Sequence, residues 1–169
     1  MSTPRLFTAS LLISSLGLMA NAHATNLKIE VFNPGAASIF PVSSEIISGD
    51  HQVALIDAQF QRNDAQTLVA KIKATGKTLT TVYISHSDPD YYFGLDVIKA
   101  NFPQAKIIAT KATIAAITAT KDGKKAYWGP ILKENAPQSI IGPQPLDGNS
   151  FTIDGKKLEG KGLDGPTPE

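Results

Sequence analysis

The sequence contains no cysteine, and neither sign of charge is in clear excess. The absence of cysteine excludes disulfide bonds, a cysteine nucleophile, cysteine-ligated zinc, iron–sulfur clusters and a lipid-anchored N-terminal cysteine. The 16 Lys and Arg residues are balanced by 15 Asp and Glu residues. A nucleic-acid-binding protein usually carries a basic surplus, so we expect no nucleic-acid partner. With 169 residues, 42% of them hydrophobic, the chain suits one folded domain rather than two.

A short apolar stretch near the N-terminus predicts a targeting signal. Arg5 precedes the stretch, which covers 6–20, and the residues at 22–24 form the small-x-small pattern that signal peptidase recognises. The stretch is shorter than the ~20 apolar residues of a membrane span. We therefore predict a signal peptide at 1–24 and a periplasmic or secreted protein that begins at Thr25 and has no membrane contact after cleavage. An uncleaved N-terminal anchor is the alternative.

The remainder, 25–169, is expected to form one domain in which strands alternate with helices, an order that favours an α/β fold with a mixed sheet. The Gly- and Pro-rich segment 122–145 is expected to be mostly loop. Lys121, Lys124 and Lys125 are interpreted as the solvated end of the helix before it. The expected strands are 27–32, 39–47, 53–56, 80–85, 106–109, 150–153 and 157–159, of which the last two are expected to form a hairpin. The expected helices are one that Asn63 or Asp64 caps and that runs to residue 74, one at 92–101 and one at 113–120. The first of these helices is expected to end before Gly76 and to have one apolar face, formed by Ala65, Leu68, Val69 and Ile72.

Two of these strands end in loops that carry acids or a histidine. Asp57 follows one strand, and His86, Asp88 and Asp90 follow the next. Such strand ends are where α/β folds place their chemistry. An imidazole and two carboxylates on one tight loop can converge on a cation, which is either a hard ion or zinc, iron or nickel. The alternatives are an Asx turn at Asp57, helix capping by Asp88 and Asp90, and a hydrogen-bonded loop histidine at His86.

The segments around these residues resemble the metallo-β-lactamase fold superfamily. The stretch 53–58, Val-Ala-Leu-Ile-Asp-Ala, is similar to the first Asp motif of the family. A helix and a strand are expected next, and then 84–94 is similar to the family motif H-x-H-x-D-H, which a glycine usually follows. In that alignment the four motif positions are held by His86, Asp88, Asp90 and Tyr91.

The resemblance implies an αββα sandwich, of which 25–169 covers about the first half. We therefore expect an incomplete fold with little more than one sheet. Asp88 and Tyr91 replace histidines of the motif, and Pro166 stands where the Gly-His-Thr-Pro-Gly turn of the family has its histidine. A neutral phenol is a poor substitute ligand. The residues expected on buried strands of this sheet are Ile29, Val31, Val53, Leu55, Val82 and Ile84. Because one apolar face of the sheet is expected to lack a partner, the chain is expected to self-associate or to be marginally stable alone.

The resemblance also implies an exported hydrolase, in which a metal ion activates water for attack on an ester, lactone, thioester or phosphoester. The small-molecule substrate is unknown. Zinc or another divalent metal is expected to bind weakly or not at all, with no more than one ion per chain. The alternative is a catalytically inactive or truncated member that binds a ligand or partner, or that has no function. The implied metal ligands are His86, Asp88 and Asp90 with Asp57 in support, and Asp90 is the implied catalytic residue.

Overall fold

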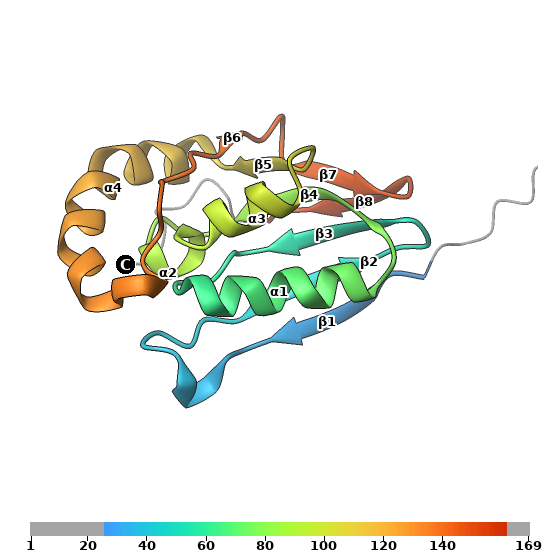
Figure 1. Cartoon of the computed structure of the whole chain (residues 1–169). Helices are drawn as coiled ribbons and strands as arrows, with labels where there is room; N and C mark the ends of the chain where they lie inside the picture. Colours follow the sequence, from blue (N-terminus) through green and yellow to red (C-terminus); the bar gives the residue numbers. More distant parts are fainter. Residues whose placement is uncertain (1–25, 162–169) are drawn as a thin grey trace, which may run out of the picture.

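The computed structural model describes residues 26–161. The predicted signal peptide at 1–24, its cleavage site and the turn around Pro166 lie outside the described residues. Over 26–161 the chain forms one six-stranded sheet, a separate β-hairpin, and helices that pack on the sheet and at its end (Figure 1). None of the helices within this range is long and apolar enough to cross a membrane.

The central sheet is mixed, as the sequence predicts. Its first three strands run antiparallel, and from the third strand onward the neighbours are parallel. The spatial order of the strands follows the sequence. The second strand begins later than the expected 39–47, because 39–43 lies outside the ladder. The strands are β1 (Lys28–Phe32), β2 (Ser44–Ser48), β3 (Gln52–Ile56), β4 (Thr78–Ile84), β5 (Lys106–Ala109) and β6 (Gln144–Pro145).

The parallel strands are joined by helices, as parallel pairing requires. The single helix expected at 92–101 is divided into two. The break lies at Gly94, whose backbone N–H donates to the carbonyl oxygen of Gln59 at 2.9 Å instead of continuing the helix. The helices are α1 (Arg62–Ala74), α2 (Pro89–Tyr92), α3 (Leu95–Asn101) and α4 (Lys111–Leu132), with short 3-10 helices η1 (Gly35–Ala37) and η2 (Lys133–Asn135).

One face of the sheet carries the main hydrophobic core, covered by α1 and α3 (Figure 1). The apolar stripe predicted for α1 is buried, and the helix is followed by Gly76 at φ +68°, as a C-terminal glycine should be. The predicted start is wrong by two or three residues, because the helix begins at Arg62 with Gln61, rather than Asn63 or Asp64, in the N-cap position. The buried stripe residues are Ala65, Leu68, Val69 and Ile72, which lie over Val53, Leu55, Val82 and Ile84 of the sheet.

The other face of the sheet is partly covered by the hairpin of β7 (Ser150–Ile153) and β8 (Lys156–Glu159), close to where the sequence predicts one. Ile153 is fully buried and packs with Ile47 and Ala54. Apolar burial of this kind docks the hairpin on the sheet, so the two-stranded piece is part of the same folded unit.

Edge strand β1 is less covered than the sequence suggests. Ile29 and Val31 are 62% and 60% exposed, whereas Val53, Leu55, Val82 and Ile84 of β3 and β4 are buried. The expectation that Ile29 and Val31 lie on a buried strand is therefore wrong. The reason is the position of β1, since the outermost strand has a neighbour on one side only.

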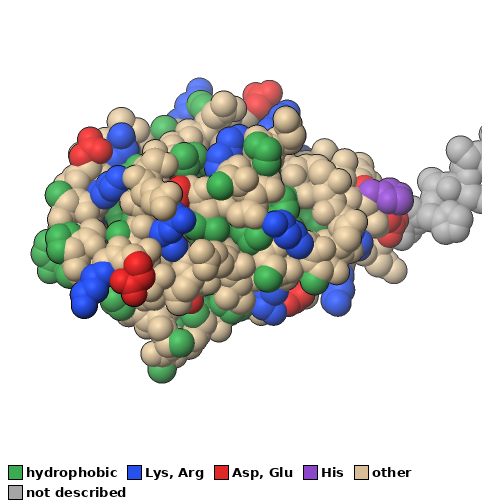
Figure 2. Space-filling model, viewed as in Figure 1, with side chains coloured by type: hydrophobic (Ala, Val, Ile, Leu, Met, Phe, Trp, Pro, Cys, Tyr) green, Lys and Arg blue, Asp and Glu red, His purple; other side chains and the backbone are tan. Residues whose placement is uncertain are grey.

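The largest departure from the sequence prediction is α4, which extends through 122–132 where a loop is expected. Gly123, Gly129 and Pro130 all have low helix propensity, and they motivated the loop prediction. Tertiary packing outweighs propensity here. The ring of Trp128 lies edge-on to Phe40 and Phe60, each with a centroid distance of 5.3 Å. Figure 2 shows further hydrophobic side chains on the surface at this end of the molecule.

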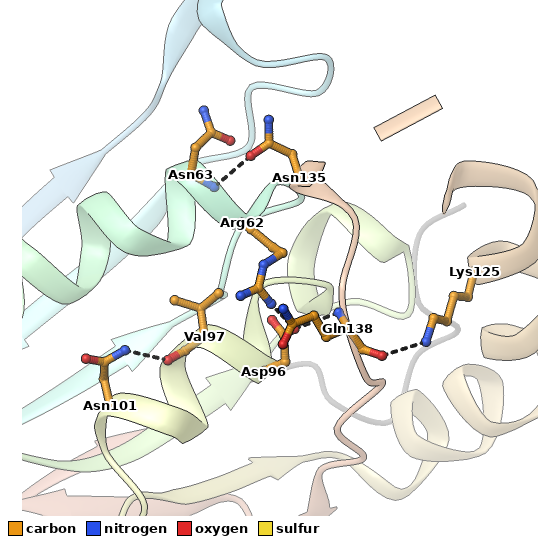
Figure 3. A network of polar contacts seen from close by, with 8 residues as sticks. All are labelled: Arg62, Asn63, Asp96, Val97, Asn101, Lys125, Asn135 and Gln138. Carbon is orange, nitrogen blue, oxygen red and sulfur yellow. Dashed lines mark hydrogen bonds and ion pairs between the residues drawn. The ribbon is translucent and has the colours of Figure 1, made fainter. Parts of the chain in front are cut away.

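The segment after α4 is held by a network of polar contacts (Figure 3). Arg62 of α1 pairs with Asp96 of α3, and Asp96 Oδ2 also accepts the backbone N–H of Gln138 at 2.8 Å. Lys125 donates from its ammonium group to the carbonyl oxygen of Gln138 at 2.9 Å. Lys125 is therefore a bridging residue rather than part of a solvated helix end, and α4 is fixed beside the sheet end at which β3, β4 and β5 finish (Figure 1).

Candidate functional site

The candidate site lies at the carboxyl ends of β3 and β4. These strands are parallel neighbours, so the residues that follow them meet at one edge of the sheet. Asp57 directly follows β3, and its backbone N–H donates to the carbonyl oxygen of Tyr83 at 2.9 Å. Ser85 and His86 directly follow β4. The two predicted strand-end motifs are thus brought together, as the sequence predicts.

Asp57 is held in an unusual conformation by contacts with Ser85. It is 4% exposed, and its φ of +59° is rare for a residue other than glycine. Asp57 Oδ1 accepts the backbone N–H of Ser85 at 2.8 Å, and Oδ2 accepts the Ser85 hydroxyl at 2.5 Å. The surrounding structure over-determines this backbone, a pattern that is common at functional sites. The Asp57 carboxylate therefore positions Ser85 of the next strand end. An Asx turn, the alternative considered for Asp57, would not explain these contacts with Ser85.

Ser85 connects Asp57 to His86. The Ser85 hydroxyl oxygen lies 2.6 Å from His86 Nδ1. With Asp57 ionised, the single hydroxyl hydrogen is donated to its carboxylate, so the Ser85 oxygen accepts a hydrogen from Nδ1. This network assigns the tautomer in which Nε2 carries a free lone pair. The imidazole also stacks on Tyr91, with a centroid distance of 4.4 Å and an interplanar angle of 26°.

Burial and like charge raise the pKa values of two carboxyl groups at this edge. Burial raises the pKa of Asp57 to about 7, hydrogen bonds from Ser85 oppose the rise, and the charges of Glu45 and Asp90 add to it. Burial also raises the pKa of Asp90. The negative charge of Asp88 adds to that rise, whereas a hydrogen bond to its own backbone N–H and the electrostatic contributions of His86 and Lys124 lower it. A positive charge placed near Asp57 and Asp90 would stabilise the ionised form of these carboxyl groups.

Asp88 is engaged by a lysine of α4. Its carboxylate Oδ1 lies 3.1 Å from Lys124 Nζ, and the same ammonium group donates to the carbonyl oxygen of Ser87 at 3.0 Å. Asp88 occupies the N-cap position of α2, but its side chain accepts no capping hydrogen bond. The capping alternative therefore does not hold for the Asp88 side chain. The interpretation of Lys124 as part of a solvated helix end is wrong, since α4 continues past it and folds back on this loop.

The donors at this edge do not form a full zinc centre. A catalytic zinc site usually has three protein ligands, and a structural one has four. Within 26–161 no group of three or more His, Asp or Glu side chains is arranged to hold a metal ion. His86 Nε2 and the Asp90 carboxylate are the donors without another strong partner in the contacts above. Burial raises the pKa of Tyr91, so its phenol is neutral at pH 7 and is a poor ligand.

Sequence reasoning missed Ser85 and Lys124. Ser85 directly precedes the motif histidine, and a hydroxyl between a strand end and a histidine is a local signal that could have been used. Lys124 has no such signal, because it lies 36 residues from Asp88 in the chain. His51, the other histidine of the described residues, is exposed in the turn before β3.

Comparisons with known proteins support the fold and leave the activity open. No protein-family model matches the sequence. The uncharacterized protein YobT of Bacillus subtilis (strain 168) is 26% identical over 104 residues, which is 62% of this chain and 40% of YobT. A relative of unknown activity carries no information about substrate.

Solved structures with the same fold include several enzymes. The B3 metallo-β-lactamase BLEG-1 matches with a TM-score of 0.54 at 13% identity, over 79% of this chain and 59% of BLEG-1. The native FEZ-1 metallo-β-lactamase of Legionella gormanii matches with a TM-score of 0.50 at 21% identity, over 69% of this chain and 45% of FEZ-1. A double mutant of the sec-alkyl sulfatase PisA1 also gives 0.50, at 18% identity, over 69% of this chain and 24% of that enzyme. The chain thus spans less than two thirds of each relative, and the shared fold does not select a substrate.

Proposed function

Because the chain has the metallo-β-lactamase fold, we propose that it is an exported hydrolase in which His86 and Asp90 bind a single divalent metal ion, with zinc as the first candidate. The observation that carries this proposal is the hydrogen-bonded chain from Asp57 through Ser85 to His86, which leaves His86 Nε2 free to act as a ligand. Supporting hydrogen bonds of this kind orient metal-binding histidines in many sites.

Each residue has a definite part in this proposal. His86 binds through Nε2, and Asp57 holds its ring in place through Ser85 rather than touching the ion, since both Asp57 oxygens accept hydrogen bonds from Ser85. Asp90, whose pKa is raised by burial, supplies the second donor and is suited to accept a proton. When bound, a divalent ion supplies Lewis-acid chemistry and lowers the pKa of a coordinated water. The substrate class is an ester, lactone, thioester or phosphoester.

Metal titration of the purified chain tests the proposal. We expect isothermal titration with Mn²⁺ or Zn²⁺ to give a stoichiometry of one, with an affinity weak enough for a chelator to strip the ion on dialysis. His86→Ala should abolish binding. His51→Ala is the matched control and should leave binding unchanged, because His51 is exposed in the β2–β3 turn. Absence of binding to the wild-type chain, or two tightly held ions, would contradict the proposal.

Export is the second part of the proposal. It is supported by the sequence pattern of Arg5, the apolar stretch at 6–20 and the small residues at 22 and 24. The protein recovered from cells should begin at Thr25, which N-terminal sequencing or intact mass measures. A soluble intracellular protein that still begins with Met1 or Ser2 would reject this part.

A second candidate function is ligand binding without hydrolysis, and the pairing of Lys124 with Asp88 favours it. An ammonium group beside the loop carboxylates already supplies a positive charge there, so the loop is stable without a metal ion. A chain that hydrolyses no member of an ester, lactone, thioester and phosphoester panel at saturating Zn²⁺, and whose melting temperature the metal does not change, would favour this candidate over the hydrolase.

A further inference from the structure

A shallow cleft opens at the edge of the sheet, beside the start of β5. Strand β6 pairs with Ile108 and Ala109 at the end of β5, and within 26–161 no strand pairs with Lys106 and Ile107 on that side. Helix α3, the start of β5 and the segment that leads into β6 line the cleft, whose volume is about 270 Å³. It lies toward the amino end of β5, whereas the candidate site lies at the carboxyl ends of β3 and β4 (Figure 1).

The polar groups that line the cleft can donate hydrogen bonds, and none of them is a carboxylate. Lys99 and Lys106 contribute ammonium groups, and Gln104 and Gln144 contribute side-chain amides. Lys99 Nζ donates one hydrogen to the carbonyl oxygen of Pro103 at 2.7 Å, which leaves two hydrogens for a ligand. Among the ion pairs of the described residues, none includes either of these two lysines.

The charge around the cleft is of one sign, although the whole chain is almost neutral. Residues 97–121, which include most of α3, all of β5 and the first half of α4, contain four lysines and no aspartate or glutamate. Residues 141–146, on the other side of the cleft, contain no acid either. Because no carboxylate in these segments offsets the two lysines of the cleft, the local potential is positive and attracts an anion.

The floor of the cleft is apolar. Ala105 and Ile107 are only 3% and 6% exposed, and Ile141 is partly buried and packs against the main core. An inorganic anion would leave this surface in water, whereas a ligand with an apolar part would cover it and gain from its burial. The volume is slightly below the ~300–1,000 Å³ that is typical of ligand pockets, so the ligand must be small.

We propose that this cleft binds a small organic carboxylate, whose charged group contacts Lys99 and Lys106 and whose apolar part lies on Ile107 and Ile141. Charge-assisted hydrogen bonds to the ammonium groups supply the polar part of the recognition, and the apolar floor discriminates against simple anions. The inference does not depend on the proposed function, because none of the residues that line the cleft belongs to the candidate site.

Benzoate and hexanoate are suitable probes, because each joins one carboxylate to a small apolar body. Either probe, titrated into the isotope-labelled chain with a chelator present, should shift the backbone amide signals of 104–107 and of the segment that leads into β6 in nuclear magnetic resonance spectra. We expect a dissociation constant on the order of 1 mM, as for a small ligand with one charged group. Benzamide, which lacks the charge, and inorganic phosphate, which lacks the apolar part, should each bind at least about fivefold more weakly than benzoate.

Substitutions separate the two parts of the recognition. Lys106→Gln should weaken benzoate binding by about fivefold, and Lys106→Arg, which keeps the charge, should restore it. Lys111→Gln is the matched control, because Lys111 is an exposed lysine of the same acid-free segment and does not line the cleft. Ile141→Ser should weaken the binding of benzoate and leave that of phosphate unchanged. If Lys106→Gln does not fold by circular dichroism, Lys99→Gln removes the other charge of the cleft.

Several results would overturn the inference. They are no shift of these amide signals with either carboxylate, equally tight binding of benzamide or of phosphate, and equal losses in Lys106→Gln and Lys111→Gln. His86→Ala should leave benzoate binding unchanged, since His86 lies at the other end of the strands. The metal titration of the candidate site and the benzoate titration of the cleft therefore succeed or fail separately.

Discussion

Asp57 is the residue on which the geometry of the candidate site most depends. Its positive φ turns the chain sharply at the end of β3, and both of its side-chain oxygens accept hydrogen bonds from Ser85. The same burial that makes these bonds strong raises the pKa of Asp57 to about 7. The residue that orients His86 therefore changes charge close to neutral pH, which gives a direct way to measure its contribution.

Replacing Asp57 with Asn should change how stability depends on pH. In the unfolded chain the carboxyl has an ordinary pKa near 3.8, and in the folded chain its pKa is about 7. Between these values the folded state binds a proton that the unfolded state has released, so folding stability falls as pH rises through this window. The limiting slope for one group is ~1.4 kcal/mol per pH unit. Asp57→Asn lacks this group and should lose less stability between pH 4 and 7.

Urea unfolding of both proteins at several pH values, with a chelator present, measures the effect. The difference in unfolding free energy, wild type minus variant, should decrease steadily from about pH 4 to about pH 7 and then level off. Parallel pH profiles for the two proteins would contradict the raised pKa of Asp57.

Among the secondary-structure elements, the loop after β3 and the junction of α2 with α3 approach each other closely. Gly94 sits at this junction, and a Cβ atom added there would lie 2.1 Å from the carbonyl oxygen of Ala58 and 2.7 Å from the Cβ of Ala65. Nearby, the backbone N–H of Ala58 donates to the carbonyl oxygen of Tyr91 at 2.7 Å. The packing of these helices thus also fixes the segment that carries Asp90 and Tyr91.

Gly94→Ala should therefore destabilise the fold. The added methyl group meets backbone that cannot move freely, and overpacking of this kind typically costs about 1–3 kcal/mol. Gly123→Ala in α4 is the matched control, since nothing lies within 4 Å of its added Cβ, and it should be neutral or stabilising by up to ~1 kcal/mol. Thermal and urea unfolding of both variants measure the difference. Equal stability of the two variants would contradict the close approach.

Elements with local signals were predictable from the sequence, and those that depend on distant contacts were not. The periodicity of Leu68, Val69 and Ile72 identified α1, and β5 was placed at its observed bounds. The end of α4 was missed because Pro130 and two glycines predict a break, whereas packing of Trp128 against residues far away in sequence keeps the helix intact. Local propensity cannot report a contact of that kind.

The same distinction between local signals and distant contacts holds for the candidate site. Asp57 and the loop at His86 were predicted to belong to one site because both follow strand ends and match the family motifs, and the parallel pairing of β3 with β4 brings them together. The hydrogen bond between Ser85 and Asp57 spans 28 residues, and the Lys124 contact with Asp88 spans 36. Both depend on side-chain directions that only the folded structure supplies. The family resemblance implied a supporting role for Asp57, but its contact through Ser85 and the pairing of Asp88 with Lys124 were beyond the sequence.

At the scale of the whole molecule, the two faces of the sheet differ in cover. Helices α1 and α3 bury one face, and the β7–β8 hairpin covers only part of the other (Figure 1). Strand β1 lies at the edge of the sheet, and within 26–161 no strand pairs with its outer side. Its exposed residues Ile29 and Val31 face away from α1, because Glu30 between them bonds Lys71 of that helix.

This exposed edge leads us to expect that two copies of the chain associate through β1. An unpaired strand with apolar side chains is a template for pairing, and the two backbones would supply hydrogen bonds that β1 lacks. Sedimentation velocity of the chain from Thr25 onward should show a concentration-dependent dimer or larger species. Val31→Lys should shift it to monomer, whereas Ile131→Lys, at an apolar residue that is 46% exposed on α4, should not. A wild-type chain that stays monomeric when concentrated and unfolds cooperatively above about 60 °C would reject self-association and marginal stability together, because that is the upper part of the range for mesophilic domains.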